Sequence, residues 1–162
     1  MYLNVTIATS IKYGNYKQYL RAAQNLQKFV NKAAPHLEKL LDVPAEMDVR
    51  IRPIYKSKYT TMYGRYVHTG DRHIELDPRY GIKSAIQTFM HEMVHVEQFH
   101  SGALEYNTWD GQYRWKGVDT DNQSIAKNYQ EYLELPWEKE AYSRQKELAI
   151  AICSMTEYDV TF

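Results

Sequence analysis

The chain has 162 residues, of which 44% are hydrophobic and 25% are charged, and this size and composition suit one domain spanning 1–162. No apolar run reaches the length of a membrane span, and the start lacks the pattern of a secretory signal. The single cysteine, Cys153, excludes an internal disulfide and a cysteine-based metal site. These features favour a reducing, cytoplasmic setting without a membrane partner.

The formal net charge is zero, but the charges are unevenly distributed along the chain. Residues 1–83 hold 14 Lys and Arg against 7 Asp and Glu, whereas residues 84–162 hold 6 against 13. This distribution predicts that the two halves attract each other within the molecule. The alternative is a basic face that binds an anionic partner.

The N-terminal half is predicted to contain one long helix and a sheet. Apolar residues spaced by three and four predict an amphipathic helix over 16–41, which Pro35 should kink or restart. His68 and His73 are expected to be surface or sheet residues, because no neighbouring ligand accompanies them. Three segments alternate in polarity or are rich in aromatic and β-branched residues, and are predicted to be strands: 46–54, 63–69 and 72–77.

The C-terminal half is predicted to contain two helices with a polar segment between them. Helical spacing resumes over 84–100, with Ser84 as the expected N-cap, and Pro136 opens a last helix through about Ser154. Segment 101–135 is expected to be irregular apart from a hairpin at Asp110-Gly111. Its aromatic residues either form a flap over a cleft or simply pack: Tyr106, Trp109, Tyr113 and Trp115.

These elements together predict the α+β class. We expect a small mixed or antiparallel sheet of three to four strands, packed on the three helices. Residues 1–83 would form the N-terminal helix and the sheet, and residues 84–162 the remaining helices and the aromatic segment. No internal repeat or linker suggests a further boundary.

Two histidines on the central helix form the most specific chemical pattern in the chain. At about 100° per residue, His91 and His95 fall on the same face as Gln98, opposite an apolar face. This H-E-x-x-H spacing suits two zinc ligands, with Glu92 placed beside them as a general base. The alternative is a chance pair of surface histidines. His100 projects to the other side and is expected to be a structural or surface residue.

A catalytic zinc site needs a third protein ligand, and the last helix offers two candidates. Glu138 shares the inward side of that helix with Ala141, whereas Glu140 shares its side with Arg144 and Glu147. A carboxylate that faces inward needs a partner, so Glu138 is the favoured ligand. The alternative for Glu138 is a first-turn acid that interacts with the helix dipole.

The segments HEMVHVEQ (91–98) and PWEKEAY (136–142) resemble the gluzincin clan of zinc metallopeptidases, especially its small single-domain members. In that clan a helix with H-E-x-x-H precedes a helix that supplies a glutamate ligand. This glutamate commonly stands three positions before an alanine and four before an acid or amide that supports a histidine. Here Glu138 precedes Ala141 and Tyr142, so the last position departs from the pattern. Gln98 also appears in several small members.

The resemblance implies a zinc-dependent metallopeptidase that acts on a peptide or protein substrate. Its zinc ligands would be His91, His95 and Glu138, and Glu92 would accept a proton from a metal-activated water and deliver it to the leaving amine. The phenols of Tyr142, Tyr129 or Tyr132 are available to stabilise the oxyanion, with Tyr142 included among the catalytic residues. The strand HIELD (73–77) resembles the edge strand that pairs with an extended substrate in this clan.

Two alternative functions are open. A non-catalytic domain would close its zinc site with a fourth ligand such as Glu140 or Asp121. A nucleic-acid-associated metalloprotein is disfavoured because DNA-linked proteases with H-E-x-x-H usually have a histidine as third ligand, and only His100 follows His95. In that alternative the following basic residues would track phosphates: Lys12, Lys17, Arg21, Lys28, Lys32, Arg50, Arg52, Lys56 and Lys58.

Overall fold

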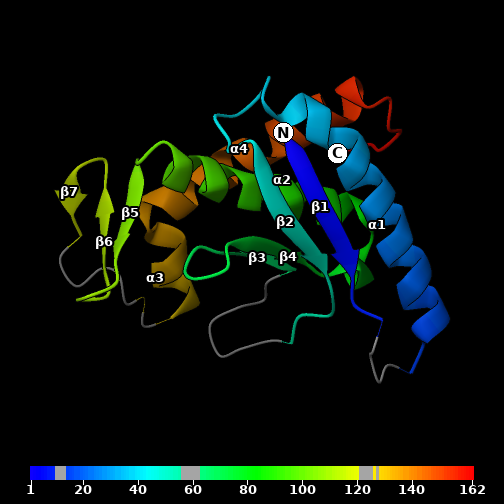
Figure 1. Ribbon diagram of the computed structural model, residues 1–162, viewed down its shortest axis with the longest axis horizontal. Coiled ribbons are helices and arrows are strands. Elements are labelled where there is room, and N and C mark those ends of the chain that lie inside the picture. The colour runs from blue at the N-terminus through cyan, green and yellow to red at the C-terminus, as the bar shows by residue number, and fades with distance from the viewer. Residues whose placement is uncertain (10–13, 56–62, 121–125, 127) are drawn as a thin grey trace.

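The computed structural model describes the chain at residues 1–9, 14–55, 63–120, 126 and 128–162. This part contains four α-helices and two sheets, of four and three strands, so the α+β class is confirmed (Figure 1). Within these residues no helix combines the length and the apolar character needed to cross a membrane. Four residues considered above lie outside the described part: Lys12, Lys56, Lys58 and Asp121.

The four-stranded sheet is mixed. Its strands β1, β2 and β4 run parallel, and β3 pairs antiparallel with β4, in the order β1-β2-β4-β3. Strand β1 was not predicted, although its apolar residues alternate with Asn4 and Thr6 as a half-buried strand requires. The strands span the following residues: β1 Tyr2–Ile7, β2 Glu46–Ile51, β3 Gly64–Val67 and β4 His73–Leu76.

The pairing order corrects one prediction about the HIELD segment. Strand β4, which contains most of that segment, is flanked by β2 and β3 and is therefore an internal strand, not an edge. The edges of this sheet are β1 and β3. Because an internal strand has no free backbone groups to offer, any added strand would have to pair with β3 or β1.

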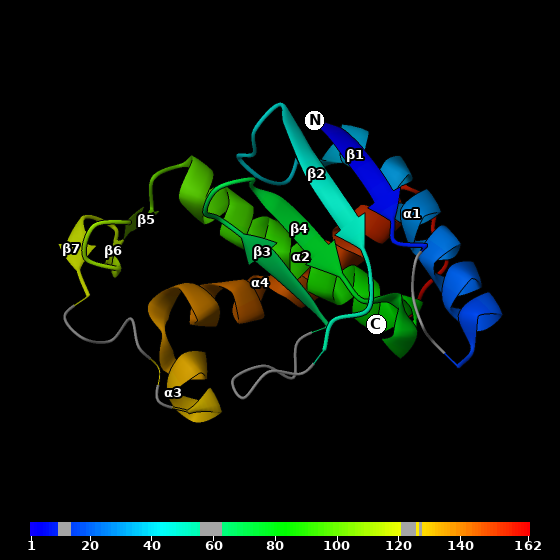
Figure 2. The ribbon, with the colours of Figure 1, turned by 60° about the horizontal axis from the view of Figure 1, so that its bottom comes forward.

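Helices cover one face of this sheet. Helix α1 (Tyr16–Leu37) packs on β1, α2 (Ile82–His100) contacts β3 and β4, and α4 (Pro136–Met155) runs against α2 (Figure 2). A short 3₁₀ helix, η1 (Pro78–Tyr80), connects β4 to α2. The core between the layers holds fully buried apolar residues from both: Val49, Ile51, Ile74, Leu76, Leu26, Phe29, Phe89, Met93 and Ile152.

Two helix boundaries differ from the predictions. Helix α1 ends at Leu37 rather than Leu41. Pro35 lies in its last turn, and because proline has no backbone N–H, one hydrogen bond of this turn is missing. Helix α2 begins at Ile82 after Gly81, so Ser84 lies inside the first turn and is not the N-cap. Gly81 has a φ of 89°, a conformation that glycine adopts easily and that redirects the chain into the helix.

The face of the sheet away from the helices carries a layer of ion pairs. Glu75 on β4 is buried beneath Arg52 and Arg65, with a distance of 2.5 Å from its Oε2 to Arg65 Nε. His73 is also buried, 3.4 Å from Arg50, so it is a sheet histidine rather than a surface one. Paired charges thus cover the half of the sheet that no helix covers.

The segment expected to be irregular folds into a second sheet and a short helix. Its hairpin turns at Asp110-Gly111 as predicted, and Gly111 has a φ of 69°. Trp115 packs near Trp137 on α4, whereas Trp109 at the hairpin tip is 96% exposed. The elements are β5 Leu104–Asn107, β6 Gln112–Trp115, β7 Val118–Asp119 and α3 Tyr129–Glu134.

The close approach of β3 to α2 gives a first prediction. A Cβ atom on Gly64 would lie 2.5 Å from Thr88 Cγ2 and 3.0 Å from the Glu75 carbonyl oxygen. We expect Gly64→Ala to lower the free energy of unfolding by about 1–3 kcal/mol, as overpacking does. Adding Thr88→Ser removes Cγ2 and should restore part of the loss in urea unfolding. Equal stability of all three proteins would contradict this packing.

Candidate metal centre

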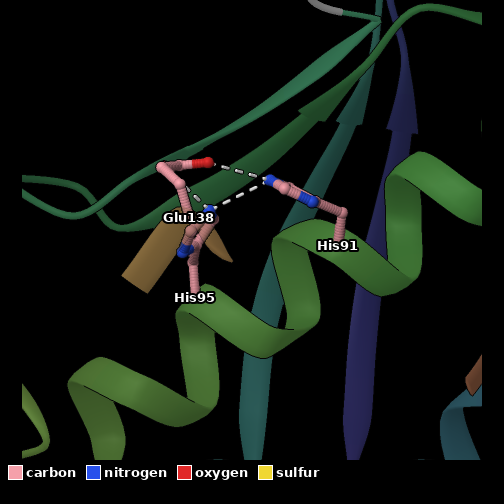
Figure 3. Close-up of side chains that lie close together, drawn as sticks. All are labelled: His91, His95 and Glu138. Atoms are coloured by element: carbon pink, nitrogen blue, oxygen red, sulfur yellow. Dashed lines mark hydrogen bonds and ion pairs between the residues drawn. The ribbon is translucent and has the colours of Figure 1, made fainter. Parts of the chain in front are cut away.

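The candidate centre lies where the first turn of α4 meets the middle of α2. Helix α2 presents His91 and His95 on the side away from its apolar face, and α4 directs Glu138 toward them (Figure 3). Pro136 begins α4, and the buried Trp137 packs in a small apolar cluster with Leu104 and Leu135. This anchoring fixes the first turn of α4 against α2, and Glu138 follows directly.

The three side chains converge at distances that suit a bound ion. His91 Nε2 lies 3.1 Å from His95 Nε2, and each nitrogen lies 3.3 Å from an oxygen of Glu138. Tetrahedral zinc holds its ligands at about 2.1 Å, which separates neighbouring ligand atoms by about 3.4 Å. The residues are only 6%, 7% and 3% exposed, so this buried group could hold a metal ion.

Amide side chains orient both imidazole rings. His91 Nδ1 lies 3.1 Å from Gln145 Oε1, and His95 Nδ1 lies 2.8 Å from Gln98 Oε1. An amide oxygen only accepts hydrogen bonds, so each Nδ1 carries a hydrogen, and in the neutral form of each ring Nε2 has the lone pair. Both lone pairs therefore face the centre, which is the arrangement that metal-bound histidines need.

Glu140, the competing candidate, supports the centre without joining it. Its Oε2 accepts a hydrogen bond of 2.8 Å from Gln98 Nε2, and its Oε1 lies 3.6 Å from Lys116 Nζ. Gln98 also donates to the backbone oxygen of Trp137. Glu140 thus helps to hold the amide that orients His95, and Glu138 supplies the converging carboxylate. Among described residues, no fourth protein ligand completes the cluster.

The electrostatics of the cluster also favour a cation. Burial alone would raise the pKa of Glu138, but His95 and His91 hold it at about 2. Burial alone would lower the pKa of His95, yet Glu138 raises it to about 9. Glu138 Oε2 is buried and accepts no hydrogen bond of normal geometry from the described residues. A buried carboxylate oxygen in this state is costly unless a positive charge lies beside it.

A cleft of about 250 Å³ opens beside His91, and Glu92 lines it. The Glu92 carboxyl is buried, and burial raises its pKa, while a hydrogen bond to the backbone of Tyr66 opposes that rise. Gly64 on β3 and Thr88 on α2 form another part of the wall. The phenols around the cleft belong to Tyr63, Tyr129, Tyr132 and Tyr142.

Tyr142 lies at the cleft but does not support a histidine. The centroid of its ring lies 4.5 Å from that of the His91 ring, in an edge-to-face arrangement, and its hydroxyl hydrogen-bonds to Tyr129. Gln145, one turn further along α4, makes the contact to His91 that the resemblance places at position 142. No sequence pattern indicated this role, although Gln145 shares the inward side of the helix with Glu138.

Tyr132 has a different role from the other phenols. It hydrogen-bonds to Glu138, and burial together with this carboxylate raises its pKa. Because its hydroxyl is engaged with Glu138, Tyr132 orients the carboxylate, which no sequence pattern indicated. His100 is exposed, 3.8 Å from Asp42, in agreement with its expected surface position.

The chain matches no protein-family model, no curated protein and no solved structure. Two imidazoles and one carboxylate, held with their lone pairs facing a common point, form a donor set for a divalent ion.

The two glutamates of α4 should differ in metal binding. We expect Glu138→Ala to lose zinc on dialysis, because it removes one of three converging ligands. Glu140→Ala, the matched control on the same helix, should retain zinc, with affinity lowered about tenfold or less through Gln98. Elemental analysis beside wild type and His95→Ala measures both. Full zinc content in Glu138→Ala would exclude that residue as a ligand.

In the metal-free protein, the ion pair between His95 and Glu138 should make the free energy of unfolding depend on pH. With its pKa raised to about 9, His95 stabilises the folded state fully at pH values below its ordinary pKa of 6.5. This stabilisation is lost as the pH rises through 9. Glu138, with its pKa lowered to about 2, stabilises the folded state at pH values above its ordinary pKa of 4.5. This stabilisation is lost only as the pH falls toward 2. Urea unfolding after chelation should therefore show a loss of stability between about pH 6 and 9.5. Glu138→Gln should flatten this dependence, and an equal slope in both proteins would contradict the pairing.

Proposed function

We propose that this chain is a zinc-dependent metallopeptidase that hydrolyses peptide bonds. The observation that carries the proposal is the convergence of His91, His95 and Glu138 beside the buried carboxyl of Glu92 and an open cleft. The proposal includes the finer arrangement expected from the sequence, in which the sheet packs on an N-terminal helix, an active-site helix and a glutamate helix.

Zinc is the ion that this donor set suits best. Two imidazole nitrogens 3.1 Å apart, each 3.3 Å from a different oxygen of Glu138, form the His₂Glu donor set of catalytic zinc sites, which keep one position for solvent. When bound in such a site, zinc lowers the pKa of water to near 7 and polarises a carbonyl. Calcium and magnesium prefer oxygen ligands in larger numbers, so they fit this cluster poorly.

Glu92 would act as the general base and then as the general acid. Its carboxyl lines the cleft next to His91, and burial moves its pKa upward, toward the range in which proton transfer is efficient. It would accept a proton from the attacking water and pass it to the leaving amine. The backbone of Tyr66 holds this carboxyl through a hydrogen bond, so its position does not depend on substrate.

Tyr142 would donate to the oxyanion that develops on the substrate. It is 40% exposed at the cleft, whereas Tyr132 is committed to Glu138. Burial raises the pKa of Tyr142, so its phenol keeps its proton and can donate at neutral pH. Tyr129, which hydrogen-bonds to Tyr142, would position that donor.

The substrate class that fits is an extended polypeptide with neutral side chains. Strand β3 is an edge of the sheet and borders the cleft, so it can pair with a substrate backbone where β4 cannot. Apart from Glu92 and His91, the described lining of the cleft consists of phenol, amide, hydroxyl and glycine groups. Such a lining offers no charged side chain to a free amino or carboxyl terminus, which favours cleavage within a chain.

Glu92→Gln should separate the base from the metal. We expect this variant to bind zinc like the wild type and to lose hydrolysis by about 10²–10⁴-fold, because an amide cannot accept the proton. The measurement is cleavage of a mixed peptide library by zinc-loaded protein, followed by mass spectrometry. Glu147→Gln, an exposed change of the same kind on α4, is the control and should cleave normally.

Two results would contradict this proposal. One is wild-type cleavage by Glu92→Gln. The other is a zinc-loaded wild-type protein that cleaves no peptide of the library, since a bound ion without turnover would indicate a non-catalytic zinc domain.

A further inference from the structure

Helix α1 is strongly basic. Its 22 residues contain four Lys and Arg, one histidine and no Asp or Glu, and amide side chains provide most of the other polar groups. Lys17, Arg21, Lys28 and Lys32 are all exposed. A solvated helix that only covers a core normally mixes both signs of charge along its outer face.

The four cations form a single row. At about 100° per residue they fall within a sector of about 60° around the helix, and α1 has no Lys or Arg outside this sector. With a rise of about 1.5 Å per residue, Lys17 and Lys28 stand about 17 Å apart along the axis, with Arg21 between them. Exposed amides flank this row at Gln24, Asn25 and Asn31.

The rest of the molecule does not neutralise this row. Between residues that the structure describes, no Lys or Arg of 1–83 forms an ion pair with an Asp or Glu of 84–162. In the described part the attraction between the two halves therefore does not take the form of direct Lys or Arg ion pairs, and the attraction itself stays a prediction. Lys32 donates to the backbone oxygen of Thr156, and no described acid pairs with Lys17, Arg21 or Lys28.

The position of the row is also electrostatically unfavourable for the isolated helix. Lys17, at one end of the row, lies in the first turn of α1, where the helix dipole favours acids, and this turn contains none. Helix α1 lies at the opposite end of the long axis from β5, β6 and β7 (Figures 1 and 2). These cations lie on an open surface and their position does not stabilise the helix. This indicates that they bind a molecule outside the chain.

We propose that the exposed face of α1 binds the phosphate backbone of duplex DNA without sequence preference. Lys, Arg and amide side chains make most protein contacts to phosphates, and one duplex charge per about 1.7 Å ensures that a row of this length meets several. Protein interfaces, in contrast, are depleted in Lys and centre on apolar anchors, which this row lacks. Single strands are usually bound by stacking on aromatic rings, and no aromatic residue lies within the row.

The test is fluorescence anisotropy of a labelled 20-base-pair duplex with the full-length chain. Three phosphate contacts predict a Kd of about 1–100 μM near physiological salt and a decrease in affinity of about 40-fold between 50 and 200 mM salt. Lys17→Gln/Arg21→Gln/Lys28→Gln should weaken binding at least tenfold and remove most of the salt dependence. Glutamine favours helices, so α1 should persist, which circular dichroism verifies.

The matched control is Lys39→Gln/Lys139→Gln/Lys146→Gln, which removes the same charge from exposed positions elsewhere and should bind like the wild type. Equal losses in both triple variants would overturn the proposal, because net charge alone would then explain binding. So would absent binding at 50 mM salt, a preference for single strands, or tighter binding of polyglutamate, which would assign the face to an acidic protein. Zinc removal and Glu92→Gln should leave DNA binding unchanged, so this proposal and the peptidase proposal fail separately.

Discussion

The structure around the centre depends on the enforced approach of three buried side chains, His91, His95 and Glu138, at the inner side of the cleft. Two ring nitrogens with lone pairs facing each other at 3.1 Å repel unless a proton or a metal ion lies between them. The hydrogen bonds that the rings donate to the amide oxygens of Gln98 and Gln145 prevent the rings from turning away. A protein that holds such an arrangement rigidly is prepared for a cation, and the other features of the cleft follow from this preparation.

The cleft combines groups from elements that are distant in sequence. Strand β3 supplies a backbone edge and the N–H that holds Glu92, α2 supplies Glu92 itself, and α3 and α4 supply the phenols. Gly64 allows β3 to approach α2 closely enough for this. Strand β3, Glu92 and His91 thereby line one surface depression, and His95 and Glu138 converge on His91, so the groups come from β3, α2 and α4.

The sequence predicted what local periodicity encodes. The long patterns around His91 and Glu138 gave two helices and the correct inward side of each, because burial repeats every three to four residues. The order of strands is set by pairing between distant segments, so β4 could be recognised as a strand but not as an internal one. The role of Gln145 was also missed, since its contact to His91 depends on how α4 is rotated against α2, and a one-turn difference replaces Tyr142 by Gln145 as the supporting residue.

Both imidazoles of the cluster donate a hydrogen bond to an uncharged amide oxygen, whereas many metal sites have a carboxylate at this position. An amide makes an imidazole less electron-donating than a carboxylate would, and two neutral rings with one acid cancel only half of a divalent charge. A divalent ion held by these residues would therefore keep more of its Lewis acidity for a further ligand. The same weak donation would also loosen retention of a divalent ion, so occupancy of this centre would follow the free concentration of that metal around the protein.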